Sequence, residues 1–253
     1  MSDRLYTGIL EEIVMKIRVV VPIITDVFNK EIMKEVAQFK SPDTEVDVVN
    51  LDRGPASIES YYDEVLAAYH IVPKVQEAEK EGIDAVFVDC FGDPGVDAAR
   101  EVVRIPVVGG FQPAALTASL ISGKWSVVTV LKSVLPMIWV LARKLGVDKN
   151  IASVRDIDTP VLELQDKKVI EQRLLEHSER AIVQDGAETI VLGCTGMMGF
   201  AQTLSKKLTE RGLPVPVVDP TAAAIGFLEM LLRSGTSQSA LTYPKPPEKE
   251  RRI

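Results

Sequence analysis

The chain has 253 residues, of which 46% are apolar and 26% are charged, with a formal net charge of −7 at pH 7. This length suffices for one large domain or two small ones, each able to bury a core. The acidic balance, without a basic block in the body of the chain, argues against nucleic acid and anionic membrane surfaces as partners.

Residues 1–16 lack the charged, apolar and small-residue order of a signal peptide, and we expect them to form an N-terminal extension. No apolar run in the sequence reaches the roughly eighteen residues of a membrane span. A cytoplasmic location follows as the expectation, and there the two cysteines stay reduced.

Short apolar runs then alternate with segments of helical periodicity along the first half. The pattern predicts strand 17–21 and helix 26–40, strand 45–51 and helix 57–80, strand 83–89 and helix 94–103, and strand 106–108 and helix 113–122. Pro73 is expected to kink or split the second of these helices.

The same alternation begins again after residue 124. It predicts strand 125–131 and helix 134–145, strand 151–154 and helix 166–184, strand 189–192 and helix 198–211, and strand 215–218 and helix 220–233. Residues 234–253 form a polar tail. Its last stretch, KPPEKERRI, interleaves bases with acids and prolines, which indicates a solvated, mobile end.

Two successive βαβαβαβα halves with near-continuous Val/Ile strands predict an α/β protein of two similar lobes. Each lobe is a short parallel β-sheet flanked by helices, and a pseudo-twofold axis relates the two lobes across a cleft. We assign residues 17–123 to the first lobe and residues 124–219 to the second, with helix 220–233 crossing back to the first.

The two cysteines occupy matching places in the two halves. Cys90 lies in EGIDAVFVDCFGDPG and Cys194 in ETIVLGCTGMMG, so each thiol ends the third strand of its half and precedes a glycine turn. Ligands of parallel sheets bind at this end of the strands, beside helix N-termini. One cysteine alone is more typical of packing, but the matched pair favours a catalytic function.

Two thiols on opposite sides of a bound molecule suit the inversion of a carbon next to a carbonyl. One thiolate removes the proton from one face, the opposite thiol returns a proton to the other face, and N–H groups of the glycine turns stabilise the enolate. Helix N-termini are expected to lower the pKa of the thiols. Neither His70 nor His177 has a partner at metal-ligand spacing, and no dinucleotide motif is present, so no metal or cofactor is predicted.

At these residues the chain resembles the aspartate/glutamate/hydantoin racemase superfamily, from about residue 17 to residue 233. The resemblance is strongest to the hydantoin and allantoin racemase branch, through DCFGDPGVDAARE, SVVTVL, IVLGCTGM and VPVVDPTAAA. It implies a cofactor-independent racemase with Cys90 and Cys194 as the catalytic bases, a small-molecule substrate and a homo-oligomer. Helix 134–145, with Trp139, is a candidate interface, although core packing explains it equally well.

The departures from the superfamily pattern bear on the substrate. Phe91 and Gly196 replace a polar residue and a histidine that amino-acid racemases of the superfamily carry, which favours a less charged ring such as a 5-substituted hydantoin. Thr195, Gln112 and Val130 depart from the hydantoin branch itself. The predicted substrate-binding residues are Pro22, Thr25, Phe91, Gly92, Gln112, Thr129, Thr195, Gly196 and Met197.

Thr129 is a candidate hydrogen-bond donor to a substrate carbonyl, while Asp93 and Asp219 are expected to cap helix N-termini. Three alternatives remain open from the sequence. They are an aspartate or glutamate racemase, a decarboxylase or cis–trans isomerase of the same fold, and a two-lobed small-molecule binding protein without catalytic activity.

Overall fold

The computed structural model describes residues 14–251, so most of the predicted N-terminal extension lies outside the described residues. The first half contains β1 (Met15–Val21), α1 (Asn29–Phe39), β2 (Thr44–Asn50), α2 (Tyr61–Lys80), β3 (Ala85–Val88), α3 (Val96–Val102), β4 (Val107–Val108) and α4 (Phe111–Ile121). Strand β1 thus begins two residues before the predicted strand, because Met15 and Lys16 pair with β2.

The second half repeats this order with three short 3₁₀ turns added. It contains β5 (Trp125–Thr129), α5 (Leu135–Leu145), β6 (Ile151–Asp156), α6 (Lys167–Val183), β7 (Thr189–Leu192), α7 (Phe200–Glu210), β8 (Val217–Val218) and α8 (Pro220–Arg233). The 3₁₀ turns are Lys132–Val134, Asp148–Asn150 and Val161–Glu163.

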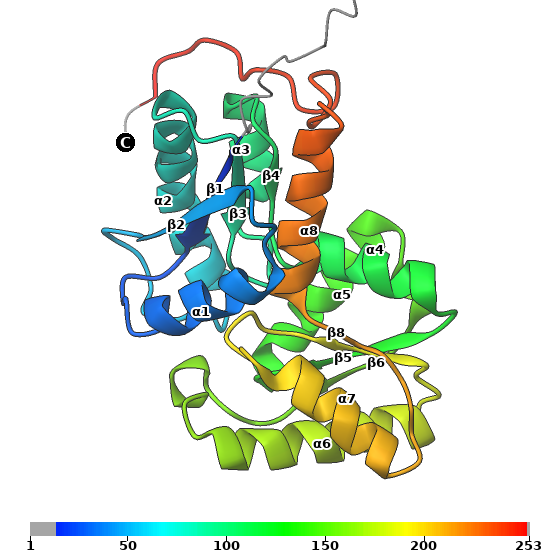
Figure 1. The fold of residues 1–253 in the computed structure, drawn as a ribbon. Coiled ribbons are helices and arrows are strands. Elements are labelled where there is room, and N and C mark those ends of the chain that lie inside the picture. Colours follow the sequence, from blue (N-terminus) through cyan, green and yellow to red (C-terminus); the bar gives the residue numbers. More distant parts are fainter. Residues whose placement is uncertain (1–13, 252–253) are drawn as a thin grey trace, which may run out of the picture.

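The two halves form two separate four-stranded sheets with the same strand order, β2-β1-β3-β4 and β6-β5-β7-β8, and every pairing is parallel. All residues of the central strands β3, β5 and β7 are buried, as their continuous apolar sequence requires when helices cover both faces. The predicted two-lobed α/β fold is confirmed (Figure 1).

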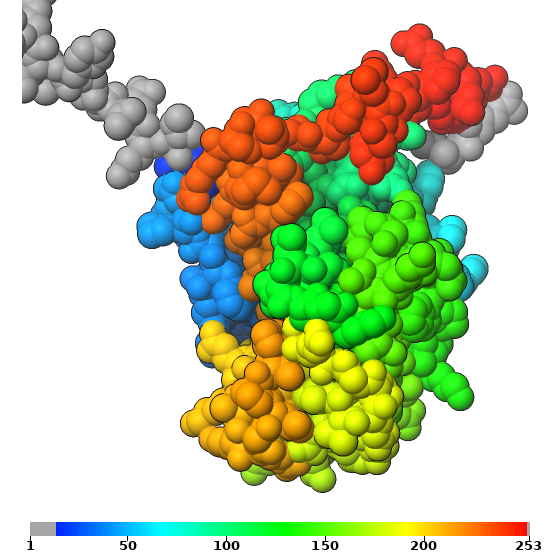
Figure 2. All heavy atoms as spheres, turned by 90° about the vertical axis from the view of Figure 1, so that its right-hand side faces the viewer, coloured from blue at the N-terminus to red at the C-terminus, as the bar shows by residue number. Residues whose placement is uncertain are grey.

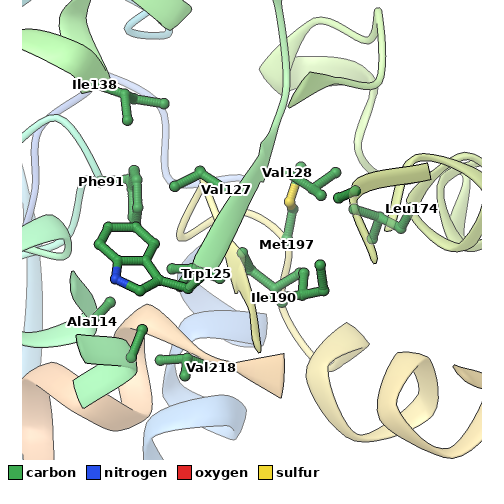
Figure 3. Close-up of a cluster of buried hydrophobic side chains, with 14 of the residues drawn as sticks. Phe91, Ala114, Trp125, Val127, Val128, Ile138, Leu174, Ile190, Met197 and Val218 are labelled. Carbon is green, nitrogen blue, oxygen red and sulfur yellow. The ribbon is translucent and has the colours of Figure 1, made fainter. Parts of the chain in front are cut away.

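The last helix of each half packs on the sheet of the other half. Ala224, Ile225 and Leu228 of α8 lie in the core beside β1 and β3. Helix α4, which sequence order places in the first lobe, instead buries one face in the core of the second sheet, through Phe111, Ala114, Ala115 and Ala118. There Ala114 lies near the indole of Trp125 (Figure 3), and Ser119 accepts a hydrogen bond of 3.0 Å from Trp125 Nε1.

This exchange also brings the two crossing helices together. Helices α4 and α8 contact one another between the lobes, and the space-filling view shows them side by side (Figure 2). The alanine-rich α4 suits this position because its small side chains allow close approach to a sheet and to a second helix. The lobes are therefore joined by two reciprocal helices.

Helix α2 runs unbroken through Pro73, so of the two predicted effects of this proline, a kink or a split, the split is wrong. It begins at Ser60, whose side chain accepts a hydrogen bond of 3.2 Å from the Asp63 N–H. Ala67, Ile71, Val75 and Ala78 form a buried stripe on both sides of the proline. This packing holds the helix together although proline removes one backbone hydrogen bond.

The C-terminal segment runs along the first lobe (Figure 2), and hydrogen bonds hold it there up to Tyr243, before the stretch 245–253 for which mobility is predicted. Ser237 Oγ donates to the Arg104 carbonyl at 2.6 Å, and Gln238 Nε2 donates to the Ile105 carbonyl at 2.8 Å. Tyr243 Oη accepts from Arg100, a buried guanidinium that needs acceptors. Within residues 14–251, no helix is long and apolar enough to cross a bilayer.

Candidate active site

The two cysteines follow the central strands β3 and β7 with the same local geometry. Cys90 and Cys194 each stand two residues beyond the strand end, and both are free and half-buried. The Gly92 N–H donates to Cys90 Sγ at 3.4 Å, and the Gly196 N–H donates to Cys194 Sγ at 3.4 Å. The duplicated sequence signature therefore corresponds to a duplicated backbone turn around each sulfur.

Both cysteines line one pocket, which lies between the lobes and has about 790 Å³ of space, including the part that opens to solvent. The first lobe contributes the β1–α1 loop, α1 and the Cys90 turn, while the second contributes the ends of β5 and β7, the start of α5 and the Cys194 turn. Residues of both lobes therefore form one pocket around the two sulfurs.

Burial dominates the ionisation of the two thiols. Together with a smaller effect of nearby carboxylates, it raises the pKa of Cys194 to about 12 and the pKa of Cys90 well above its usual value. The backbone N–H groups of the turns partly oppose this effect. The predicted lowering of the thiol pKa is therefore wrong, because desolvation outweighs the turn N–H groups.

Six predicted substrate-binding residues line the pocket, and three do not. The six are Pro22, Phe91, Gly92, Thr129, Thr195 and Gly196. Gln112 lies outside the pocket because its side-chain oxygen accepts from Arg100 Nη2 at 3.0 Å. Met197 is 1% exposed and packs in the second core beside Val128 (Figure 3). Thr25 Oγ1 accepts from the Val27 N–H at 3.3 Å within the β1–α1 loop.

Thr129 reaches the pocket wall, but its hydroxyl proton is already used. Thr129 Oγ1 donates to the Gly193 carbonyl at 2.7 Å, and the side chain is fully buried. A hydroxyl has one proton to donate, so Thr129 in this conformation cannot donate to a substrate carbonyl as predicted. The bond instead fixes the strand end that leads to Cys194.

Asp89 is the charged pocket residue that sequence reasoning missed. It directly precedes Cys90, is 7% exposed, and burial raises the pKa of its carboxyl group to about 7. Thr195 Oγ1 donates to the Asp89 carbonyl oxygen at 3.2 Å, which joins the two thiol turns across the lobes. Asp89 Oδ1 has no hydrogen-bond partner among the described residues. An acid at the end of the apolar run AVFVD was the available signal.

Asp93 and Asp219 cap helix N-termini, as predicted, but in different ways. Asp219 accepts from the Thr221 and Ala222 N–H groups of its own helix α8, at 2.9 and 3.0 Å. Asp93, in the Cys90 turn, instead caps α4 by accepting from Phe111 and Gln112 at 2.8 and 3.1 Å. Its carboxylate lies only 2.2 Å from where a Cβ on Gly109 would stand, so glycine is required at position 109.

An apolar wall completes the pocket, and its residues come from several loops and helices far apart in sequence. They are Phe28, Ile32, Ile58, Val134, Met137, Ile138, Val161 and Met198. Among the described lining residues, none is lysine, arginine or histidine, and Asp89, Cys90 and Cys194 are the ionisable ones. The site thus combines two thiols, one buried carboxyl group and an apolar surface.

Comparisons with known proteins agree with this geometry. The family model described as Asp/Glu/Hydantoin racemase matches residues 17–228. The chain is 38% identical to the hydantoin racemase of Pseudomonas sp. (strain NS671) over 237 residues, covering 93% of each chain. It is 36% identical to the hydantoin racemase of Paenarthrobacter aurescens over 239 residues, covering 93% of this chain and 99% of that one.

Among solved structures, the crystal structure of allantoin racemase from Pseudomonas fluorescens superposes with a TM-score of 0.88 at 32% identity. The superposition covers 94% of this chain and all of that one (100%). The resemblance therefore extends over both lobes and over both cysteine turns.

Proposed function

The chain belongs to the Asp/Glu/hydantoin racemase family and is a racemase, and from that premise we propose that Cys90 and Cys194 exchange protons with one carbon of the substrate. The observation that carries this proposal is the pair of thiols, one from each lobe, on one pocket with equivalent turns around both sulfurs. The two groups also lie within electrostatic reach, since Cys194 contributes to the raised pKa of Cys90.

The reaction requires that one cysteine is a thiolate while the other is a neutral thiol. A thiolate removes the hydrogen next to a carbonyl, the electron pair enters the carbonyl as an enolate, and the opposite S–H protonates the other face. The Gly92 and Gly196 N–H groups support this cycle by stabilising whichever sulfur carries the negative charge. They are therefore directed at the sulfurs rather than at the enolate oxygen, in contrast to the role expected from the sequence.

The charge of the pocket favours a 5-substituted hydantoin over a free amino acid. An α-carboxylate in this pocket has no cationic side chain among the described lining residues and lies near the acidic Asp89. Burying an unpaired carboxylate is costly. A neutral ring avoids this cost, and the apolar wall accommodates an aliphatic or aromatic substituent.

Proton exchange with solvent tests the function directly. The protein is incubated in D₂O with single enantiomers of a 5-benzyl hydantoin, a 5-isobutyl hydantoin, allantoin, aspartate and glutamate. We expect loss of the α-hydrogen signal in proton NMR together with loss of optical rotation for the apolar hydantoins. Turnover of aspartate or glutamate but of no ring compound would contradict the proposed substrate class.

A requirement for only one thiol, or release of carbon dioxide from an arylmalonate-type substrate, would point instead to the decarboxylase alternative. The non-enzymatic alternative is set aside because the chain is an isomerase of the racemase family. The cytoplasmic location and the homo-oligomeric state stay predictions from the sequence.

A further inference from the structure

A buried carboxyl group joins the two lobes beside the pocket. Glu35 lies in α1 of the first lobe and is 4% exposed. Its Oε1 accepts a hydrogen bond of 2.8 Å from the N–H of Gly199, where α7 of the second lobe begins (Figure 1). Gly199 has no side chain with which to cap α7, so Glu35 places an acceptor at this helix N-terminus from the other lobe.

The residues next to this hydrogen bond belong to the pocket wall. Ile32, one turn before Glu35 on the same face of α1, lines the pocket from the first lobe. Met198, directly before Gly199, lines it from the second lobe. Met198 also packs against the apolar core of the first lobe, which contains Ile32. The hydrogen bond between Gly199 and Glu35, called the clamp below, therefore sets how closely these two wall residues approach.

A second buried acid lies beside Glu35 at the start of α8. The Oδ1 of Asp219 accepts from two N–H groups of α8, and its side chain is in hydrogen-bonding contact with Glu35. Burial, the charge of Asp219 and, more weakly, that of Asp89 raise the pKa of Glu35 to about 9. A neutral carboxyl group can accept from Gly199 and donate its proton to Asp219. Glutamine is therefore the substitution that imitates Glu35 most closely.

On the basis of the proposed racemisation of 5-substituted hydantoins, we propose that Glu35 is a positioning residue that holds Met198 against the first-lobe wall and thereby limits the size of the 5-substituent. The clamp acts on the apolar wall and not on the thiols, which accept N–H groups of their own turns. Without the clamp, Met198 moves away from Ile32 and the pocket widens. A small substituent then loses contacts, while a large one gains space.

Two substitutions at Glu35 separate the clamp from the bulk of the side chain. Glu35→Gln keeps an oxygen that accepts from Gly199, whereas Glu35→Leu keeps the size but leaves the Gly199 N–H without its acceptor. Polarimetry gives kcat/KM of each variant with 5-methyl and 5-benzyl hydantoin. In Glu35→Leu we expect the benzyl-to-methyl ratio to rise roughly tenfold, through KM rather than kcat. In Glu35→Gln the ratio should stay that of the unsubstituted protein.

Glu229→Leu is the matched control, because Glu229 also joins a helix to the first lobe but is not among the described residues that line the pocket. It is buried in α8, and its carboxylate accepts from the Ser41 N–H, the Ser41 hydroxyl and the Thr44 hydroxyl at 2.7, 2.7 and 2.6 Å. Glu229→Leu should lower stability to urea, as Glu35→Leu does, but leave the ratio in place. An equal rise in both leucine variants would overturn the proposal, as would an unmoved ratio in folded Glu35→Leu.

Hydrogen exchange in the unsubstituted protein decides if circular dichroism shows that Glu35→Leu does not fold. Coupling between two sites is reciprocal, so a substituent that the clamp opposes must weaken the clamp. The Gly199 amide, followed by NMR, should exchange faster with saturating 5-benzyl hydantoin than with saturating 5-methyl hydantoin. Equal exchange rates would overturn the proposal. Absence of racemisation in the unsubstituted protein would instead refute the proposed function, whereas racemisation with an unmoved ratio refutes the clamp alone.

Discussion

The two lobes share a backbone plan but differ in the groups that control charge. Both sheets have the same strand order, and both thiols accept a turn N–H at 3.4 Å. The first lobe, however, contributes the buried acids Glu35, Asp89 and Asp93, while the second contributes Asp219, and α8, which packs on the first sheet, adds Glu229. Duplication thus fixes where the two thiols lie, while the buried acids are distributed unequally between the lobes.

The largest expected effect comes from removing either thiol, since the duplicated turns imply that both are required. Cys90→Ser and Cys194→Ser should each lower the racemisation rate by at least about 10²-fold, the usual contribution of a general acid or base. Polarimetry with a 5-substituted hydantoin measures the loss. Serine is nearly isosteric, so unchanged thermal unfolding serves as the control. Full activity in one variant would show that the lobes do not share the reaction.

A stability comparison tests the helix exchange. Trp125→Ala removes a fully buried side chain of the second core and the bond to Ser119, which should cost about 3–5 kcal/mol in the free energy of unfolding. Phe87→Ala is the matched change in the first core. Because α4 and α8 link the cores, urea unfolding should stay a single transition in both variants. Two separate transitions, with one unchanged, would contradict this linkage.

The pH dependence of stability should reveal the buried acids of the first lobe. Burial raises the pKa of Asp89 and Asp93 to about 7, so between pH 4 and 7 the folded protein holds protons that the unfolded chain has released. Stability should therefore fall as pH rises through this window. Asp89→Asn should weaken that fall by up to about 1.4 kcal/mol per pH unit, measured by urea unfolding at several pH values.

Asp185 of the second lobe is the control for this measurement. Its pairing with Arg155 lowers the pKa of Asp185, so its proton is lost below the window in both folded and unfolded states. Asp185→Asn should leave the slope between pH 5 and 7 unchanged. An equal change of slope in the two variants would show that the acid asymmetry of the lobes does not control stability.

The smallest expected effect concerns the ends of β1 and β5. β1 and β5 are the corresponding strands of the two sheets, and they end at Val21 and Thr129. The hydroxyl of Thr129 donates a hydrogen bond to the Gly193 carbonyl, whereas valine has no hydroxyl. Thr129→Val should cost about 1–2 kcal/mol, because the buried Gly193 oxygen loses its partner, with KM unchanged. Thr129→Ser keeps the hydroxyl and should recover the stability measured by urea unfolding. A raised KM in the valine variant alone would instead indicate substrate binding by Thr129.

The two parallel sheets could be predicted from the sequence, as could the matching positions of Cys90 and Cys194 after the third strand of each half. Both predictions depend on local patterns that occur twice in the chain. It did not reveal the partner of α4. The residues Phe111, Ala114 and Ala118 indicate burial, but periodicity does not specify which sheet they cover. Chain order suggested the first lobe, whereas packing places the helix on the second.

Within the site, the sequence indicated which turns reach the pocket but not how individual side chains are used. Gln112 is bound by Arg100, and the hydroxyl proton of Thr129 is taken by Gly193. Both depend on partners that are distant in sequence. The direction of the thiol pKa shift was also missed, because desolvation depends on the completed pocket rather than on the turn itself.

The helix exchange has a consequence for the synthesis of this protein on the ribosome. The strands of the first sheet are complete at residue 108, but α8, which covers one of its faces, begins at residue 220. At roughly 5–20 residues per second, the 220 − 108 = 112 steps from the end of β4 to the start of α8 take about 6–22 s. During this interval the nascent sheet exposes an apolar face, so chaperones have a defined segment to protect until the last helix emerges.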